Sequence, residues 1–388
     1  MILTKNILYK NFSIKNYKSH TYKNLDVILK NKNAVLKSLT AEYKYSFSKS
    51  LIKKFKNFST MRIIGMGGSI LGVKAIKSFL NFKIKKKVVF VDNLLPYRNL
   101  LENNKKILNI VISKSGNTLE TISNANILIK KNHKKIFVTE NKENYLRVLG
   151  NKLKAEIINH NNFIGGRYSV LSEVGMLPAS LLGLQEKRFK QFNKLIKNKN
   201  FVNSLINNVE SMIFFLRSKK FNSIIINYDE KSEDFFKWYQ QLVAESLGKN
   251  QKGVFPLIST MPKDNHSLMQ LYLDGPKNNF FTFFNVNEKK SNKIINSSII
   301  KSHNYLKNKN LSKILDSQRN ATEEVFRRKK IPFRSFEIKN RSEEVLGELF
   351  TFCILETILL AKALKVNPYN QPSVELIKEA TLNNLKKN

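Results

Sequence analysis

The segment at residues 113–121 has the composition of a turn that binds phosphate. It reads Ser-Lys-Ser-Gly-Asn-Thr-Leu-Glu-Thr and directly follows the apolar run at 107–112. Such a run, followed by hydroxyl residues and a glycine, predicts a buried strand that turns into a helix. The start of that helix would offer free backbone N–H groups and a partial positive charge, and the glycine would let the backbone approach a ligand. The plainer alternative is a helix that is merely capped by serine or threonine.

A second glycine cluster lies at residues 65–72, which read Gly-Met-Gly-Gly-Ser-Ile-Leu-Gly. Ser69, at the predicted helix start, could donate to phosphate oxygens or only cap the helix. A dinucleotide site is the alternative, although Ile70 stands where the G-x-G-x-x-G pattern needs its third glycine. Asp92 follows the next predicted strand and could bind a ribose, so this alternative stays open.

Three further segments carry side chains suited to moving protons or stabilising charge. Arg167 follows two glycines and could stabilise an oxyanion, or it could form a structural ion pair. Glu245 lies near the end of a predicted helix at 233–247 and is either a general base or a solvated carboxylate. His266 lies at a predicted helix start in a polar cluster, where a histidine can transfer protons near neutral pH.

The last polar cluster lies near the C-terminus. Gln371 precedes Pro372, which should end one segment and begin a helix, and Lys378 follows two turns later. Both side chains could reach a site if the tail packs back over the rest of the chain. The alternative is a frayed polar tail.

The elements that must position these residues alternate between strand and helix. Strands are predicted at 61–65, 87–91, 107–112, 135–139, 222–227, 279–286 and 333–338, and helices at 69–80, 118–130, 174–184, 189–216, 233–247, 310–328 and 342–364. This alternation predicts an α/β fold with parallel sheets that are covered on both faces. We divide the chain into an N-terminal helical layer at 1–55, two tandem α/β domains at 56–200 and 201–364, and a C-terminal helical tail at 365–388.

The bulk composition excludes several classes of protein. The chain has 388 residues and a formal net charge of +39, yet its basic residues are spread over the whole length, so we expect no specific nucleic-acid partner. A positive field would instead attract a small anionic substrate. Cys353 is the single cysteine, so neither an intrachain disulfide nor a cysteine metal cluster is expected. No apolar run has the length of a signal peptide core or a membrane span, so we expect a cytoplasmic protein without membrane contact.

In their order along the chain, these motifs resemble the glucose-6-phosphate isomerase family. The resemblance spans about residues 63–378 and includes the segments 244–249, 265–276 and 370–378. It implies two sugar-isomerase domains, each a three-layer α/β/α unit with a parallel sheet. It also implies the reversible conversion of glucose 6-phosphate to fructose 6-phosphate, through ring opening and a cis-enediolate, without metal or cofactor. The family forms homodimers, and the neighbouring subunit would supply His266.

The resemblance also implies a role for each matched residue. Glu245 would carry a proton between C2 and C1, and Arg167 would stabilise the enediolate between the two transfers. His266 and Lys378 would assist ring opening. The residues that would bind the sugar phosphate are Ser69, Ser113, Lys114, Ser115, Thr118 and Gln371. Two alternatives stay open, a dual phosphoglucose/phosphomannose isomerase and a non-catalytic regulator that binds a sugar phosphate.

Overall fold

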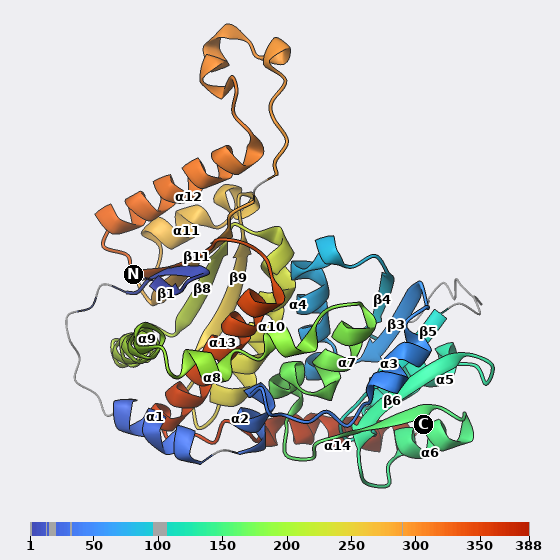
Figure 1. Ribbon diagram of the computed structural model, residues 1–388. Helices are drawn as coiled ribbons and strands as arrows, with labels where there is room; N and C mark the ends of the chain where they lie inside the picture. Colours follow the sequence, from blue (N-terminus) through green and yellow to red (C-terminus); the bar gives the residue numbers. More distant parts are fainter. Residues whose placement is uncertain are drawn as a thin grey trace.

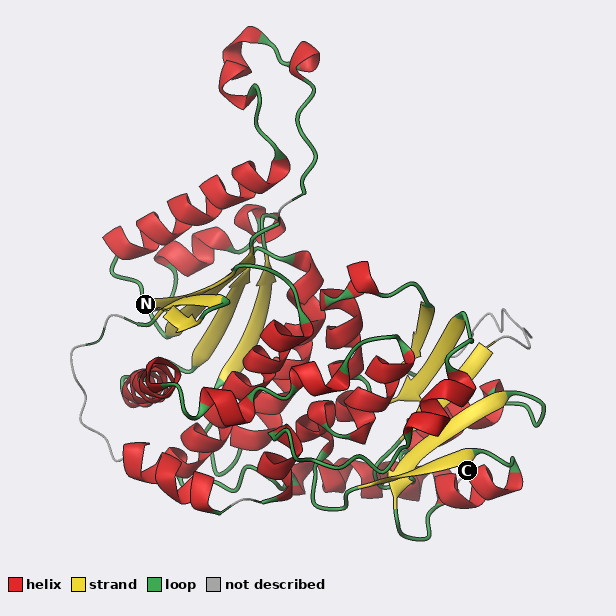
Figure 2. Ribbon diagram, in the orientation of Figure 1, coloured by secondary structure: helices red, strands yellow, loops and turns green. Residues whose placement is uncertain are grey.

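The computed structural model describes residues 2–12, 14, 21–31, 33–95, 107–288 and 290–387. Two sheets lie side by side, with helices on their faces and a layer of helices between them (Figures 1 and 2). The predicted α/β fold with parallel sheets is confirmed.

The first sheet consists of five parallel strands in the order β4-β3-β5-β6-β7. The strands are β3 (Thr60–Gly65), β4 (Lys87–Val91), β5 (Ile107–Ile112), β6 (Lys134–Glu140) and β7 (Glu156–His160). On one face, Ile110 and Ile112 of β5 belong to a core with α3 (Lys49–Phe55) and α7 (Glu173–Leu181). On the other face, Val111 belongs to a core with α5 (Leu119–Leu128) and α6 (Tyr145–Lys152). Both faces of β5 are therefore buried, which explains its unbroken apolar sequence.

The second sheet has the order β1-β2-β11-β10-β8-β9. Its parallel strands are β8 (Asn222–Asn227), β9 (Phe255–Thr260), β10 (Asn279–Val286) and β11 (Phe333–Ile338). The large buried core on one face includes residues of α9 (Lys199–Arg217), α10 (Glu233–Leu247) and α13 (Glu343–Leu364). The opposite face packs on α11 (Met269–Asp274) and α12 (Leu311–Arg328). Each sheet thus has helices on both faces, as the three-layer prediction requires.

The two sheets are joined by helix packing. Helix α4 (Leu71–Phe79), which follows β3, packs against α10 of the second unit in the region between the sheets (Figure 1). Trp238 of α10 is fully buried, and its Nε1 donates to the carbonyl oxygen of Arg167 at 3.2 Å. A helix of the second unit is therefore fixed against the segment that carries a candidate site residue of the first.

The N-terminal segment is not the purely helical layer that we expected. Residues Ile2–Thr4 (β1) and Ile7–Lys10 (β2) are strands, and β2 pairs antiparallel with β11 at the edge of the second sheet. Ile7 and Tyr9 are buried while Lys10 is exposed, which is the alternation of a strand with one buried face. The helical prediction is correct for α1 (Thr21–Lys30), α2 (Ala34–Leu39) and α3.

The helix expected at 189–216 is interrupted. A 3-10 turn, η4 (Glu186–Phe189), and the single-turn α8 (Phe192–Leu195) precede α9. Helix α9 begins anew because the side chain of Asn198 accepts hydrogen bonds from the backbone N–H groups of Asn200 and Phe201. Strands β7 and β9 and helix α6 lie where we predicted no element.

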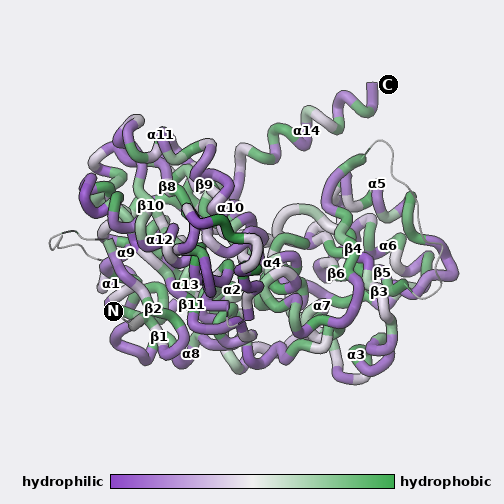
Figure 3. The backbone as a smooth tube through the Cα atoms, turned by 90° about the horizontal axis from the view of Figure 1, so that it is seen from above, coloured by the Kyte–Doolittle hydropathy of each residue, from purple (hydrophilic) through white to green (hydrophobic). Residues whose placement is uncertain are grey.

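The predicted C-terminal tail contains the helix α14 (Pro372–Lys387), which begins at the expected proline. It has no buried residue and extends from the body of the protein (Figure 3). A second projection is the connection between β10 and α12, which contains the 3-10 turns η7 (Asn296–Ser298) and η8 (Lys301–Leu306) (Figure 1).

Candidate active site

Residues 113–118 form a tight turn between β5 and α5, as the sequence predicts. Ser113 Oγ and Thr118 Oγ1 lie 2.8 Å apart, so the two ends of the turn contact each other. Gly116 has φ +67°, and a Cβ at this position would lie 1.8 Å from Oδ1 of Asn144. Both the backbone angle and the lack of space therefore require glycine here. Asn117 Oδ1 accepts from the backbone N–H of Tyr145 at 3.0 Å and ties the turn to α6.

The turn presents donors that suit an anion. The first N–H groups of α5 have no partner within their own helix, and the helix dipole adds a partial positive charge. Lys114 is half-buried, and this burial lowers the pKa of its ammonium group. Its carbonyl oxygen accepts from Glu140 N at 2.9 Å and from Thr139 Oγ1 at 3.1 Å, which fixes the backbone. Ser115 is exposed at the same turn.

The glycine cluster after β3 lies next to this turn, because Gly65 is paired with Ile112 in the sheet. It forms the 3-10 turn η1 (Gly67–Ser69), and Ser69 is partly exposed there. The order of the strands reverses at this point, since the chain proceeds from β3 to β4 on one side and from β5 to β6 on the other. Ligands of open α/β sheets bind at such a position, outside the carboxyl ends of the strands.

The nucleotide alternative is disfavoured by two contacts. A Cβ on Gly68 would lie 2.1 Å from the carbonyl carbon of Gly166, so η3 (Gly166–Leu171) covers the backbone that a pyrophosphate would need to approach. Asp92, the candidate ribose ligand, forms an ion pair with Lys74 at 2.7 Å.

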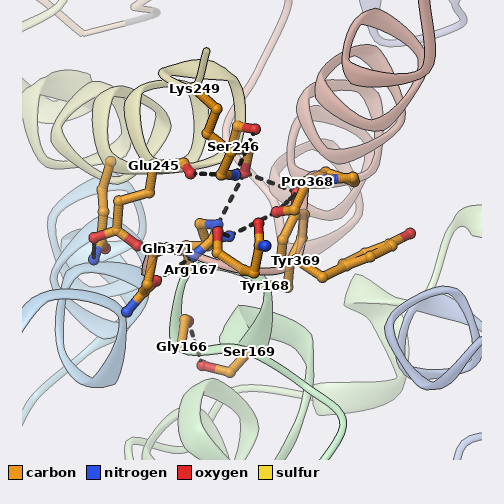
Figure 4. Close-up of polar contacts among 12 residues, drawn as sticks. Gly166, Arg167, Tyr168, Ser169, Glu245, Ser246, Lys249, Pro368, Tyr369 and Gln371 are labelled. Atoms are coloured by element: carbon orange, nitrogen blue, oxygen red, sulfur yellow. Dashed lines mark hydrogen bonds and ion pairs between the residues drawn. The ribbon is translucent and has the colours of Figure 1, made fainter. Parts of the chain in front are cut away.

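Arg167 lies at the centre of a buried polar network (Figure 4). The residue is 2% exposed, and Nη1 of its guanidinium group donates a hydrogen bond to Glu245 Oε2 at 3.0 Å. The same group connects helix α10 of the second unit to the segment before α14. Its other acceptors are Ser246 Oγ at 2.9 Å, Gln371 Oε1 at 2.5 Å, Pro368 O at 2.6 Å and Asn370 O at 3.0 Å. The structure therefore brings together three residues predicted from distant motifs, namely Arg167, Glu245 and Gln371.

Glu245 has a second fixed contact that sequence reasoning did not assign. Gln241, one helical turn earlier on α10, donates from Nε2 to Glu245 Oε1 at 2.8 Å. A Cβ on Gly67 would lie 2.7 Å from that same Nε2 atom, so the amide packs against the turn after β3. The i, i+4 spacing of Gln241 and Glu245 is the signal that could have identified it. The side chain of Glu245 remains 27% exposed and can thus meet a ligand.

Lys249 forms hydrogen bonds at the C-terminal end of α10. Its Nζ donates to the carbonyl oxygens of Glu245, Ser246 and Asn367 at 2.9, 2.9 and 2.7 Å. Burial lowers its pKa to about 8, with a further lowering from the nearby charge of Arg167. Lys249 therefore fixes the helix end that carries Glu245, as well as the start of the segment that carries Gln371.

Two predicted residues lie apart from this network. His266 is exposed at the end of the 3-10 turn η6 (Lys263–His266), three residues before α11. Lys378 is exposed on α14, where its Nζ forms an ion pair with Glu375 at 2.7 Å. Within the described residues, no hydrogen bond or ion pair joins either side chain to Arg167 or Glu245.

A family model described as phosphoglucose isomerase matches residues 26–382. The chain belongs to this family. The glucose-6-phosphate isomerase of Methanocaldococcus jannaschii is 33% identical over 345 residues, which cover 83% of each chain. The glucose-6-phosphate isomerase of Campylobacter jejuni is 31% identical over 333 residues, covering 81% of this chain and 82% of that protein.

Solved structures agree with this membership at the level of the fold. A hypothetical protein from Thermus thermophilus superposes with a TM-score of 0.81 at 22% identity, over 94% of each chain. A glucose-6-phosphate isomerase from Chlamydia trachomatis superposes with a TM-score of 0.76 at 17% identity, over 99% of this chain and 89% of that one. In the described part of the chain, no helix has both the length and the apolar composition of a membrane span.

Proposed function

We propose that this protein interconverts glucose 6-phosphate and fructose 6-phosphate. The observation that carries the proposal is the contact between Arg167 and Glu245. Glu245 lies on the helix whose Gln241 packs against Gly67, in the turn next to residues 113–118. A carboxylate fixed next to a guanidinium can move a proton on a carbon skeleton, and the turn can hold the phosphate at the other end of the substrate. The relatives named as glucose-6-phosphate isomerases favour this substrate pair over a dual phosphoglucose/phosphomannose activity.

The chemistry balances without an external oxidant. In the open-chain aldose, the carboxylate of Glu245 takes the proton from C2, and the C–H electrons form a C1–C2 double bond as the carbonyl oxygen becomes an oxyanion. Arg167 stabilises this enediolate through its charge. A proton then moves from the hydroxyl group on O2 to the oxyanion on O1, so that O2 carries the negative charge, and Glu245 returns its proton to C1. The carbonyl is then at C2, and the product is the ketose.

The positions of the remaining groups follow from this reaction. Ser69, Ser113, Lys114, Ser115 and Thr118 would bind the phosphate, whose binding energy holds C1 and C2 against Glu245. Gln371, which shares Nη1 of Arg167 with Glu245, would position the base or contact the sugar hydroxyls. Gln241 would hold the carboxylate in one orientation.

We further propose a homodimer, in which a second copy supplies His266 for ring opening. His266 is exposed in a single chain, so it is available to a neighbouring molecule. Helix α14 exposes several apolar side chains that a second copy could cover, and Lys378 lies on the same helix. These are Val374, Leu376, Ile377, Leu382 and Leu385. A cytoplasmic location belongs to this proposal, and cell fractionation tests it.

The variant Glu245→Gln tests the base. It keeps the size of the side chain but removes the proton acceptor, so turnover of fructose 6-phosphate in a coupled assay should fall by about three orders of magnitude or more. Binding of the sugar phosphate, measured by calorimetry, should persist because the turn at 113–118 is unchanged. Glu324→Gln, on the exposed face of α12, is the matched control and should be fully active. Normal turnover by Glu245→Gln would refute the assignment.

Mixing two inactive variants tests the shared site. Glu245→Gln and His266→Ala are each expected to be inactive as homodimers. If His266 acts across the interface, a randomly mixed dimer has one intact site, and an equimolar mixture should recover about a quarter of the wild-type activity. If His266 acts within its own chain, both sites of a mixed dimer are defective and no activity returns. The latter result would contradict the proposal.

A further inference from the structure

His160 is a buried histidine to which the proposed reaction gives no role. It is the last residue of β7 and is 2% exposed, although its sequence neighbours Asn159 and Asn161 are both exposed. Buried polar atoms normally have hydrogen-bond partners, so the contacts of the two ring nitrogens indicate what this side chain does. From His160 the chain continues into the loop at 161–165, which leads to η3 and Arg167.

The Nε2 atom of His160 bonds to this loop. It lies 3.0 Å from the carbonyl oxygen of Ile164, a residue that is fully buried. A carbonyl oxygen can only accept, so Nε2 carries the hydrogen of this bond. The bond joins the end of the strand to a residue three positions before Arg167.

The other ring nitrogen faces the far end of the same segment. His160 Nδ1 lies 3.5 Å from Oε2 of Glu173, the first residue of α7. Glu173 is 2% exposed, and its carboxylate accepts from Tyr43 Oη at 3.1 Å on both oxygens and from Ser46 N at 3.3 Å. Within the described residues Nδ1 has no hydrogen-bond partner. The directional bond of the ring is therefore the one from Nε2 to Ile164.

The segment that carries Arg167 is held at two places. In η3, Ser169 Oγ donates to the carbonyl oxygen of Gly68 at 3.3 Å, which ties this turn to the one after β3. At the entry to η3, the tie is the bond from His160. In the part of the chain that the structure describes, residues 162–165 form no other hydrogen bond to a residue outside 161–168.

We propose that His160 is a positioning residue for Arg167, and that it acts through the bond from its Nε2 to the carbonyl oxygen of Ile164. The bond fixes the entry to η3 and thereby the place of the guanidinium beside Glu245. This role rests on the proposed isomerase function and deepens it. Arg167 must face the oxyanion of the enediolate, and a displacement of about 1 Å at a reacting centre can cost about a hundredfold in rate.

Glutamine and asparagine at position 160 separate the two ring nitrogens. The amide nitrogen of glutamine extends about as far from the backbone as Nε2 of histidine, whereas that of asparagine extends only about as far as Nδ1. His160→Gln can therefore keep the bond to Ile164, and His160→Asn cannot. Both variants lack the imidazole and carry the same neutral amide. His133→Asn, at a partly exposed histidine before β6, is the control for the loss of a histidine.

Two measurements on the full-length protein test the role. In His160→Asn, kcat for fructose 6-phosphate should fall by about tenfold to a hundredfold, while KM changes by less than about threefold because the phosphate turn is unaltered. Amide hydrogen exchange should become faster in peptides covering 161–168 but not in those from β5. His160→Gln and His133→Asn should both keep kcat within about threefold of the wild type.

A merely structural histidine would give a different result. Both substitutions at position 160 would then lower the free energy of unfolding in urea, while the kcat of the folded protein would stay unchanged. That result would overturn the proposal, and so would a loss of about tenfold or more in kcat for folded His160→Gln, which decides the question if His160→Asn does not fold. A wild type without isomerase activity would refute the proposed function itself. The exchange of residues 161–168 in the variants would still show whether His160 holds the loop.

Discussion

Replacing Arg167 by lysine should detach the C-terminal segment from the body of the protein and weaken catalysis. The guanidinium makes three hydrogen bonds to residues 368–371 and contacts Glu245 and Ser246 on α10. Lysine preserves the charge, but its donors are all on one nitrogen, whereas the planar guanidinium reaches several directions at once. A lysine at this position has three donors on one nitrogen and therefore cannot keep all the contacts with α10 and the segment at 368–371.

The size of the effect follows from the contacts that are lost. A hydrogen bond to a charged group contributes about 1.5–3 kcal/mol, and lysine would lose at least two of the three bonds to the segment. Two lost bonds should destabilise the segment by about 3–6 kcal/mol. Because about 1.4 kcal/mol corresponds to a tenfold change in an equilibrium, the detached population should rise by about two to four orders of magnitude.

Amide hydrogen exchange measures this directly. We expect peptides covering residues 366–378 to exchange much faster in Arg167→Lys than in the wild type, while peptides from β5 stay protected. The kcat/KM for fructose 6-phosphate should fall by about a hundredfold or more, because the charge near the enediolate moves and Gln371 is released. Ser246→Ala, which removes one neutral acceptor on α10, is the control and should leave the exchange of 366–378 unchanged. Unaltered exchange in Arg167→Lys, or activity within about tenfold of the wild type, would refute the reasoning.

Two further variants test other contacts. Gln241→Leu removes the hydrogen bond to Glu245 Oε1, so kcat should fall by about tenfold or more with little change in KM, and a change confined to KM would contradict the positioning role. Lys190, whose Nζ donates to the carbonyl oxygens of Ser38 and Leu171, has its pKa lowered by burial to about 7. Between pH values of about 7 and 10.5, Lys190 is protonated in the unfolded chain but neutral in the folded protein. The free energy of unfolding of the wild type should therefore rise with pH over this interval, relative to that of Lys190→Met. Urea titrations of both proteins at several pH values measure this difference. A constant difference between the two proteins would contradict the shift.

The strands that the sequence predicts with correct bounds are β4, β5, β8, β10 and β11. In β5, β8 and β10 nearly every position is buried, so the apolar run itself marks the strand. Strand β9 escaped notice because it lies at the sheet edge, contains Pro256 and exposes 68% of Phe255. The edge strand β4, by contrast, keeps an unbroken apolar run at 88–91, and the sequence predicts it.

The N-terminal strands were missed for a different reason. β2 is stabilised by pairing with β11, and the hydrogen-bonded residues are more than three hundred positions apart in the chain. No local pattern encodes that pairing. The alternation of Ile7 and Tyr9 was readable, but a stretch of four residues is too short to distinguish a strand from an irregular segment.

The active-site network shows the same limit. Arg167 and Glu245 are 78 residues apart, and Arg167 and Gln371 are 204 apart, so only the order of the motifs in a known family could suggest their contact. The acceptors at Pro368 and Asn370 are backbone carbonyl oxygens. Any residue type supplies such an atom, so composition gives no indication of it. Only the structure therefore reveals that the C-terminal segment holds the side chain of Arg167 in place.

The packing of the two units against each other determines the geometry of the site. Helix α10 belongs to the second unit, yet its last turn carries Glu245 to the first unit, where Gln241 packs against Gly67. The separation between the base and the phosphate turn is thus set by how α10 packs on α4 and η3. Trp238, fully buried and donating to the carbonyl oxygen of Arg167, resists sliding of α10 along this contact. Apolar packing hardly depends on ionic strength, so the geometry of proton transfer should be insensitive to salt. Added salt should still screen the attraction between the anionic substrate and this chain, whose net charge is +39.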